Sequence, residues 1–429
     1  MLWLIIVVVF VAMLLGGVLI GVTLGLIGLI ILYVGGGLSA LQAGAIATWA
    51  AMYNYPLAAL PMYIFLGEIF VASGLASRSY DAITPLFERA PGKLLTSNVV
   101  LDTMFGAVVG SSMATAACVG AIAYPELSKR GYNRTAVVGN LAGAGTLGSF
   151  VPPSLPLILY GAWVDVSVGA CFAAALIPAI LTAGLFIIFL AVASRVRPDI
   201  APAGKPVSLL NALKATRAVW PLILLMGSIM GTIYFGIATA VEAAGLGACI
   251  AVVMSFCFKT FSFERLHRAL SAAVRTCGQL LLIISGAMIF SISLSSIGIP
   301  RQVVLGVAAM NLSPLVVVLF VYLLYLVLGC FFNFIGMMVM TIPFTFPLMM
   351  NVGVDPFWFG VVLVVLCEMG LLTPPVGLNL FILQGVTNNE VSLGEVARGA
   401  IPYFLLLGMT LMLITIFPQL CTWLPAHMR

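Results

Sequence analysis

Long apolar blocks separated by short polar breaks run along the whole chain. Several blocks extend for about 20 residues, the length that a helix needs to cross roughly 30 Å of hydrocarbon. Lipid offers the backbone no hydrogen-bond partner, so a spanning segment must be a helix or part of a closed barrel. Continuous blocks of Leu, Ile, Val and Ala favour helices. The pattern predicts an all-α polytopic membrane protein.

A repeated spacing of Pro and Gly relates the two ends of the chain. Five residues of the first half recur as the same residue type at an interval of 222: Pro125, Gly131, Gly148, Pro152 and Pro153 match Pro347, Gly353, Gly370, Pro374 and Pro375. Nearer the start, Gly17, Gly28 and Gly67 match Gly236, Gly247 and Gly286 at an interval of 219. A register sustained this long predicts an internal duplication.

The longest polar break, Arg195 to Arg217, sets the boundaries of that duplication. We expect a first repeat over 1–194, a cytoplasmic linker over 195–217 and a second repeat over 218–429. Each repeat would hold scaffold helices, over 1–75 and 218–298. Each would also hold a hairpin with a broken helix, over 94–161 and 313–382.

Composition and charge sharpen this picture. Only 7% of the 429 residues are charged and 63% are apolar, whereas soluble domains carry about 25% charged residues. The basic residues lie in short breaks and not on one face, so the net charge of +5 does not indicate nucleic-acid binding. The eight cysteines show no metal-ligand spacing.

The distribution of Lys and Arg predicts that the two repeats are inverted. Sixteen of the 18 basic residues lie in the breaks at 76–93, 127–135, 195–217, 259–278 and 385–398, which the positive-inside rule assigns to the cytoplasm. The basic break at 128–134 corresponds to the uncharged break at 350–356. Conversely, the uncharged break at 35–56 corresponds to the basic break at 259–278. Inverted repeats are typical of secondary transporters, with the site near the midplane.

This sidedness requires that 94–127 begins and ends in the cytoplasm, and that about 313–349 begins and ends outside. Each segment is therefore expected to be a re-entrant hairpin. Met1 to Val34 and Trp220 to Phe258 are each expected to hold two short spans, with Met1 to Val34 retained and not cleaved as a signal peptide. The total is about ten spans and two hairpins.

Small and polar residues mark the expected hairpin tips. The first hairpin turns at Gly110, Ser111 and Ser112, where hydroxyls and free carbonyls offer the hard oxygen ligands that Na⁺ requires. Close helix packing through small residues is the alternative. The second hairpin carries Asn333 and Gly336 at the equivalent place.

Paired prolines predict a helix break in each repeat. Pro152-Pro153 and Pro374-Pro375 remove backbone donors and disfavour helix before them, and each pair follows a glycine, Gly148 or Gly370. A broken helix exposes carbonyls and a positive N-terminal end inside the membrane, whereas a packing kink is the alternative. The polar side chains available at these breaks are Thr146, Ser149, Ser154, Thr373 and Asn379.

Four acids lie within apolar blocks, where ionisable groups are costly and suggest function. Glu368 directly precedes the second break and is the strongest charged candidate for ion or substrate coupling. Asp102 lies on the first hairpin and is expected to orient its turn. Glu68 and Glu242 are expected to pair with polar groups of the scaffold.

Enzyme chemistry is not predicted. Gly110-Ser111-Ser112 superficially resembles a serine nucleophile, but the two histidines, His267 and His427, fall at membrane edges far from it. The chain has no phosphate loop, His-Glu-x-x-His or paired-aspartate motif.

These residues resemble the large membrane subunit (M, DctM-like) of tripartite ATP-independent periplasmic (TRAP) transporters. The resemblance covers nearly the whole chain. The matching stretches are Gly67 to Ala76, Phe105 to Ala116, Arg130 to Tyr132, Gly145 to Gly161, Thr239 to Gly245 and Glu368 to Phe381.

The resemblance implies a multi-pass protein of the bacterial or archaeal cytoplasmic membrane that imports an organic acid by Na⁺ symport and an elevator mechanism. It implies two partners besides membrane lipid, a small four-helix membrane subunit and a periplasmic substrate-binding protein. It implies Na⁺ as coupling ion, with no organic cofactor. A stand-alone Na⁺ symporter or antiporter that needs no binding protein is the alternative.

Carried over by position, the resemblance also implies two kinds of site residue. Those facing Na⁺ are Gly110, Ser111, Ser112, Gly148, Pro152, Gly336, Gly370, Thr373 and Pro374. Those facing the carboxylate or sulfonate substrate are Ser111, Ser154, Asn333, Asn379 and Glu368. The chain departs from the family at Asn333, where an acid is common, and at Leu366, where Asn is common.

Overall fold

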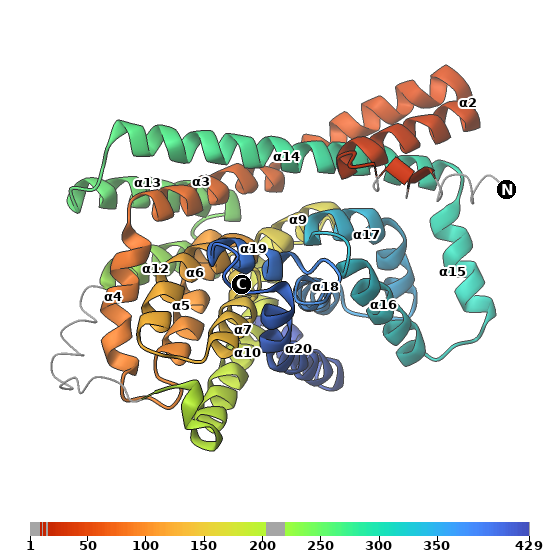
Figure 1. The fold of residues 1–429 in the computed structure, drawn as a ribbon. Helices are drawn as coiled ribbons and strands as arrows, with labels where there is room; N and C mark the ends of the chain where they lie inside the picture. Colours follow the sequence, from red (N-terminus) through yellow and green to blue (C-terminus); the bar gives the residue numbers. More distant parts are fainter. Residues whose placement is uncertain (1–8, 11, 14–15, 203–218, 429) are drawn as a thin grey trace.

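The computed structural model describes residues 9–10, 12–13, 16–202 and 219–428, and every regular element in these ranges is a helix (Figure 1). Eight of these helices are long and apolar enough to cross a membrane. The predicted all-α polytopic fold is confirmed. Residues 203–218 of the expected linker lie outside the described ranges.

One layer of the molecule is formed by helices of the two expected scaffolds. They are α2 (Ile20–Met52), α3 (Ala59–Ala72), α12 (Trp220–Tyr234), α13 (Ala240–Cys257) and α14 (Phe263–Ser296). In Figure 1 the long helix α14 lies across the top of the view, packed along α2 and α3. Segments far apart in sequence therefore interleave in this layer.

Helix α2 reverses direction at Gly37, whose φ of 63° only glycine adopts readily. A Cβ on Gly44 would lie 2.6 Å from Leu32 Cδ1, which shows that the two arms of α2 pack face to face. The break predicted over 35–56 is therefore confined to Gly37 and to the residues that follow Met52.

Three further polar breaks of the sequence contain helices. Helix α4 (Leu75–Phe87) occupies the break at 75–94, the first turns of α14 occupy 259–278, and α15 (Ile299–Ala309) occupies 298–314. The physical reason is amphipathicity, because a helix with one polar face interrupts an apolar block without breaking the backbone hydrogen bonds.

Two helical hairpins and two interrupted helices fill the second layer. The hairpins are α5 (Leu94–Val109) with α6 (Ser112–Lys129), and α16 (Pro314–Gly329) with α17 (Phe334–Asn351). The interrupted helices are α7 (Arg134–Gly145) with α8 (Leu147–Phe150) and α9 (Leu155–Val164), and α18 (Pro356–Leu371) with α19 (Leu378–Val386). Helices α10 (Val168–Val196), α20 (Leu393–Ile416) and α21 (Gln419–Ala426) complete the layer.

The helix bounds in the two halves follow the repeated spacing. Both ends of α17 match those of α6 at an interval of 222, and the start of α18 matches the start of α7 at the same interval. The capping residues match as well, since Ser111 and Asn333 cap α6 and α17, and Asn133 and Asp355 cap α7 and α18. The opposite orientation of the halves and the re-entry of the hairpins stay predictions.

Candidate functional site

The tip of the first hairpin contacts the break between α8 and α9. Gly110 has a φ of 67°, and its carbonyl oxygen accepts a hydrogen bond from Leu155 N at 3.2 Å. A Cβ on Gly110 would lie 2.9 Å from the Pro153 carbonyl oxygen, so a side chain does not fit. Ser112 N donates to Ser149 Oγ at 2.7 Å. Tip and break are thus joined by two hydrogen bonds.

The second half repeats this arrangement with backbone groups. Val376 N in the α18–α19 break donates to the Cys330 carbonyl oxygen of the second hairpin tip at 3.2 Å. Glycines also meet in both halves: a Cβ on Gly106 would lie 2.8 Å from Gly148 Cα, and one on Gly329 would lie 2.7 Å from Gly370 Cα. Each hairpin therefore packs on its own broken helix through a pair of glycines.

A cluster of buried oxygens lies where the first hairpin meets α18. Ser112, Thr115, Ser149 and Glu368 are all 0% exposed. The hydroxyls of Ser112 and Ser149 lie beside the Glu368 carboxylate, although neither makes a hydrogen bond of regular geometry with it. Ser112 Oγ, Thr115 Oγ1 and both Glu368 oxygens have no hydrogen-bond partner among the described residues.

Burying an oxygen without a hydrogen-bond partner in an apolar core costs folding free energy. The cost is highest for a carboxylate that has no counter-charge. Hydroxyl and carboxylate oxygens are hard ligands, which suit Na⁺ in the same way as they suit other hard cations. The four residues of this oxygen cluster supply one carboxyl group and three hydroxyls from three helices. The arrangement can therefore bind a monovalent cation.

Three of the predicted substrate residues cap helices. The side-chain oxygens of Ser111, Ser154 and Asn333 accept hydrogen bonds from Ala114 N at 3.5 Å, Leu157 N at 3.4 Å and Gly336 N at 2.8 Å. Each cap satisfies a donor at the N-terminal end of α6, α9 or α17, the positive end of the helix dipole. Ser154 is 0% exposed, whereas Ser111 and Asn333 are partly exposed.

The fourth and fifth predicted substrate residues are fully buried. Glu368 belongs to the oxygen cluster. Asn379, on α19, is 0% exposed, and neither its amide nitrogen nor its oxygen finds a partner in the described part of the chain. A buried, unsatisfied amide is a further candidate contact for a polar ligand.

The predicted Na⁺ residues fall into two groups. Gly110, Ser111, Ser112, Gly148 and Pro152 converge around the first tip and break. Gly336, Gly370, Thr373 and Pro374 belong to the second tip and break, where Thr373 Oγ1 donates to the Met369 carbonyl oxygen at 2.8 Å and Pro374 is exposed. Within the described ranges no hydrogen bond joins the second group to the first.

Three residues at these contacts escaped the sequence-based selection, namely Gly106, Gly329 and Thr115, whereas Ser149 was named there only as an available polar side chain. The two glycines could have been found from the sequence, because Gly106 and Gly329 are 223 residues apart, close to the interval of 222 that separates their contact partners Gly148 and Gly370. Thr115 lies one helical turn after Ser112 and so shares its face. The approach of Glu368 from the other half had no signal in the sequence.

The remaining acids behave differently from Glu368. Glu242 caps α13 by a reciprocal hydrogen-bond pair with Thr239, as expected for a scaffold role. Asp102 is 0% exposed, and its carboxylate makes no hydrogen bond to the hairpin turn or to any other described group.

Fold and site together define a class: a helical membrane transporter with paired hairpins and broken helices. The chain matches the family described as "Tripartite ATP-independent periplasmic transporter, DctM component" over residues 7–420. The chain therefore belongs to the DctM family of TRAP transporters, and it is a multi-pass bacterial membrane protein.

Named relatives agree with this assignment. The chain is 33% identical over 383 residues to the C4-dicarboxylate TRAP transporter large permease protein DctM of Pseudomonas aeruginosa, covering 89% of this chain and 88% of that one. It is 27% identical over 406 residues to the isethionate TRAP transporter permease protein DctMQ of Oleidesulfovibrio alaskensis, covering 94% of this chain and 63% of that one. Both relatives are named as transporter permeases and not as enzymes.

A solved structure supports the fold. The crystal structure of the Alcanivorax borkumensis YdaH transporter superposes with a TM-score of 0.62 at 15% identity, covering 91% of this chain and 90% of that one.

Proposed function

We propose that the chain imports an organic anion by symport with Na⁺, and that Na⁺ binds at the oxygen cluster of Ser112, Thr115, Ser149 and Glu368. The observation that carries the proposal is the unpaired Glu368 carboxylate, fully buried beside two hydroxyls. A monovalent cation there would neutralise the carboxylate and satisfy the Ser112 and Thr115 hydroxyl oxygens, which have no hydrogen-bond partner among the described residues.

Cation binding would also close the first hairpin. The oxygen cluster draws its ligands from the tip (Ser112, Thr115), the break (Ser149) and the opposite half (Glu368). A cation that bridges these elements stabilises the arrangement in which the tip is bonded to the break. Transport is then coupled to Na⁺ because the closed state binds the cation better than the open state.

The anion would bind between the two breaks, beside the positive N-terminal ends of α9 and α19. Ser154 and Asn379 are its proposed side-chain contacts in this region, with Ser111 and Asn333 at the two tips. Helix N-termini favour carboxylate and sulfonate groups. The two relatives described above are named for a C4-dicarboxylate and for isethionate, which are anions of these two kinds.

The movement that carries the anion across is proposed to be an elevator motion of the hairpins and broken helices against the scaffold layer. Two amphipathic helices support this view, since α4 leads from the scaffold into the first hairpin and α15 leads into the second. Helices that lie along the membrane surface can pivot without exposing backbone groups to lipid.

Membership of a tripartite family supports two partners, a small four-helix membrane subunit and a periplasmic binding protein that delivers the anion. The chain covers only 63% of the relative named DctMQ, which leaves room in that longer protein for a further membrane segment. We propose that a separate subunit fills this role here.

The test is uptake of a labelled C4-dicarboxylate and of isethionate into proteoliposomes that contain this chain and the small subunit encoded beside it. An inward Na⁺ gradient is applied with and without the neighbouring binding protein. We expect uptake only with both, and collapse of the gradient with a Na⁺ ionophore should abolish it. Glu68→Gln, which changes a membrane acid outside the oxygen cluster, is the matched control and should transport normally.

Uptake that needs Na⁺ but no binding protein would agree with the proposed cation site and would contradict the proposed need for a binding protein, so that the chain would be a stand-alone carrier. Uptake that proceeds equally without a Na⁺ gradient would remove the proposed coupling.

A further inference from the structure

A buried hydrogen-bonded chain joins three helices away from the oxygen cluster. Asn98 Nδ2 on α5 donates to Asn140 Oδ1 on α7 at 3.0 Å, and Asn140 Nδ2 donates to the Tyr403 hydroxyl on α20 at 3.0 Å. Asn98 and Asn140 are 0% exposed and Tyr403 is 2% exposed. This polar chain has no counterpart in the second half, where the positions equivalent to Asn98 and Asn140 at the interval of 222 hold Phe320 and Val362. The repeated fold therefore does not require it.

An isolated acid lies one helical turn from Asn98 on the same helix. Asp102 lies four residues after Asn98 on α5, so the two side chains share a face of the helix. Both Asp102 carboxylate oxygens and Asn98 Oδ1 lack a hydrogen-bond partner among the described residues. Three buried acceptors with no donor are thus gathered on one face, a situation that one added proton would relieve.

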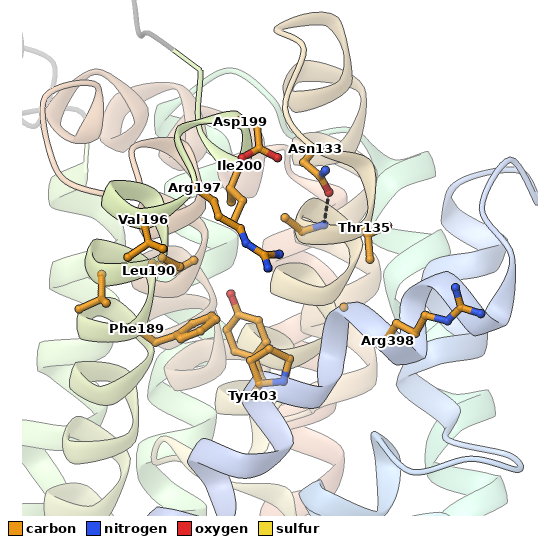
Figure 2. A pocket seen from close by; sticks show the side chains of 15 residues that line it. Asn133, Thr135, Phe189, Leu190, Val196, Arg197, Asp199, Ile200, Arg398 and Tyr403 are labelled. Atoms are coloured by element: carbon orange, nitrogen blue, oxygen red, sulfur yellow. Dashed lines mark hydrogen bonds between the residues drawn. The ribbon is translucent and has the colours of Figure 1, made fainter.

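The other end of the polar chain opens to solvent. Tyr403 forms the floor of a cavity of about 620 Å³ between α7, α10 and α20, lined also by Thr135, Phe189 and Arg197. Figure 2 shows the Tyr403 hydroxyl directed into this cavity, with the Arg197 guanidinium reaching over it. Arg197 and Arg398 line the cavity, and both lie in breaks that the charge distribution predicts to be cytoplasmic.

Close packing of α7 on α20 fixes the geometry of this connection. A Cβ on Gly143 would lie 2.1 Å from Tyr403 Cγ, and one on Gly139 would lie 2.1 Å from the Gly399 carbonyl carbon. The tyrosine ring therefore lies flat against the α7 backbone, which brings its hydroxyl to Asn140.

The direction of the hydrogen bonds depends on the state of Asp102. In the arrangement described, Tyr403 accepts from Asn140, Asn140 accepts from Asn98, and Asn98 offers a bare oxygen, which suits a protonated Asp102 that donates. If Asp102 is ionised, both amides must turn over so that Asn98 donates to the carboxylate and the Tyr403 hydroxyl donates to Asn140. The hydroxyl at the cavity floor thus changes role with the proton on Asp102.

We propose that Asp102 is a buried proton site and that Asn98 and Asn140 couple its protonation state to Tyr403 at the floor of the cytoplasmic cavity. The step forms one O–H bond on Asp102 as a hydronium ion from the cytoplasm becomes water, and the reverse step returns the proton. Import then responds to cytoplasmic pH independently of the Na⁺ site.

Few other titratable groups lie close enough to Asp102 to take its proposed role as the proton site. On the helices packed against α5, which are α3, α4, α6, α7, α8, α10 and α12, the titratable side chain that faces Asp102 is the Cys118 thiol of α6. No ion pair reaches Asp102 from the described part of the chain.

The experiment is infrared difference spectroscopy of the purified transporter in lipid nanodiscs, titrated across the neutral pH range. We expect the C=O band of a protonated carboxylic acid and the C–O band of Tyr403 to change together with one midpoint. Tyr403→Phe identifies the tyrosine band. The titration is made in Glu368→Gln, so that the other unpaired buried carboxyl does not contribute, and Asp102→Asn in that background should abolish both changes. Asn140→Leu, similar in shape, should keep the acid band and abolish the tyrosine response.

Asn98→Leu breaks the polar chain at another point. It replaces Asn140→Leu in the experiment if that variant does not fold, and the same result is expected. Glu68→Gln, a membrane acid off this chain, should leave both bands unchanged. In the Glu368→Gln background, an acid band that survives Asp102→Asn would overturn the proton site, and a tyrosine response that survives Asp102→Asn would overturn the coupling. The readout requires neither Na⁺ nor substrate, so its failure is separate from a failure of the proposed symport.

Discussion

The two regions in which a hairpin tip meets a helix break have similar backbone contacts but different side chains. The first joins Gly110–Ser112 to residues 151–154, the second joins Cys330–Asn333 to Thr373–Val376, and each is closed by a glycine pair and an interhelical backbone hydrogen bond. Their side chains differ at equivalent positions: Ser112, Thr115, Ser149 and Ser154 correspond to Phe334, Met337, Leu371 and Val376 at an interval of 222.

Burial separates the two regions as well. Residues 151–155 of the first break are all buried, whereas Pro374 and Pro375 of the second break are exposed. The comparison teaches that duplication preserved the positions where the backbone must turn or approach closely, while the ligands diverged. The hydroxyls of the proposed cation site therefore lie in the first region, and their equivalents in the second region are apolar.

The sharpest test of the comparison is whether the two regions face opposite ways. Single cysteines at Lys129 and Asn351, which end α6 and α17 at an interval of 222, should react with a membrane-impermeant thiol reagent from opposite faces. The native cysteines are replaced first, and labelling is measured in right-side-out and inside-out vesicles. We expect each cysteine to be labelled in one type of vesicle and not in the other. Labelling of both cysteines from the same side would contradict the inverted topology.

The shared backbone predicts matched losses of stability. Gly106→Ala and Gly329→Ala each push a methyl group into the backbone of Gly148 or Gly370, so each should cost about 1–3 kcal/mol. Thermal unfolding in detergent measures both. Gly245→Ala, where a Cβ meets nothing within 4 Å, is the control. A large loss in one variant without the other would show that the regions do not share this packing.

The difference in chemistry predicts unequal effects on Na⁺. Glu368→Gln removes the only charge of the oxygen cluster and should lower Na⁺ affinity about 10- to 100-fold. Thr146→Val changes the equivalent position in the first half, where the hydroxyl donates to the Gly143 carbonyl oxygen, and should leave Na⁺ affinity nearly unchanged. Na⁺ titrations of uptake and of thermal stability measure both, and equal effects would contradict the assignment.

A smaller effect is expected from single hydroxyls. Thr115→Val keeps the side-chain shape but removes one proposed ligand, so Na⁺ affinity should fall by up to about tenfold. Ser112→Ala should act in the same direction. Met337→Leu, at the position equivalent to Thr115, conserves volume outside the oxygen cluster and should leave Na⁺ affinity unchanged. Unaltered Na⁺ dependence in Thr115→Val and Ser112→Ala would move the cation elsewhere.

Much of the fold could be predicted because its determinants are local. Apolar length indicates membrane helices, and Pro and Gly mark breaks and turns by removing a donor or permitting a positive φ, as Gly110 and the two Pro-Pro pairs demonstrate. The polarity of 75–94, 259–278 and 298–314 marked them only as breaks between apolar blocks, and in the structure these residues form amphipathic helices. Local polarity does not distinguish a loop from a helix that lies along an interface.

For the candidate site, the sequence by itself determined which residues are unusual: a Ser-rich tip, repeated Pro-Pro breaks and acids within apolar blocks. Only the tertiary structure decided which of them meet. Glu368 reaches Ser112 and Ser149 from the other half of the chain, whereas Asp102 has no hydrogen-bond partner among the described residues and lies one helical turn after Asn98, which is joined through Asn140 to Tyr403. The physical reason is that residue type and spacing report local backbone preferences, while the pairing of charges and hydroxyls depends on how distant helices pack.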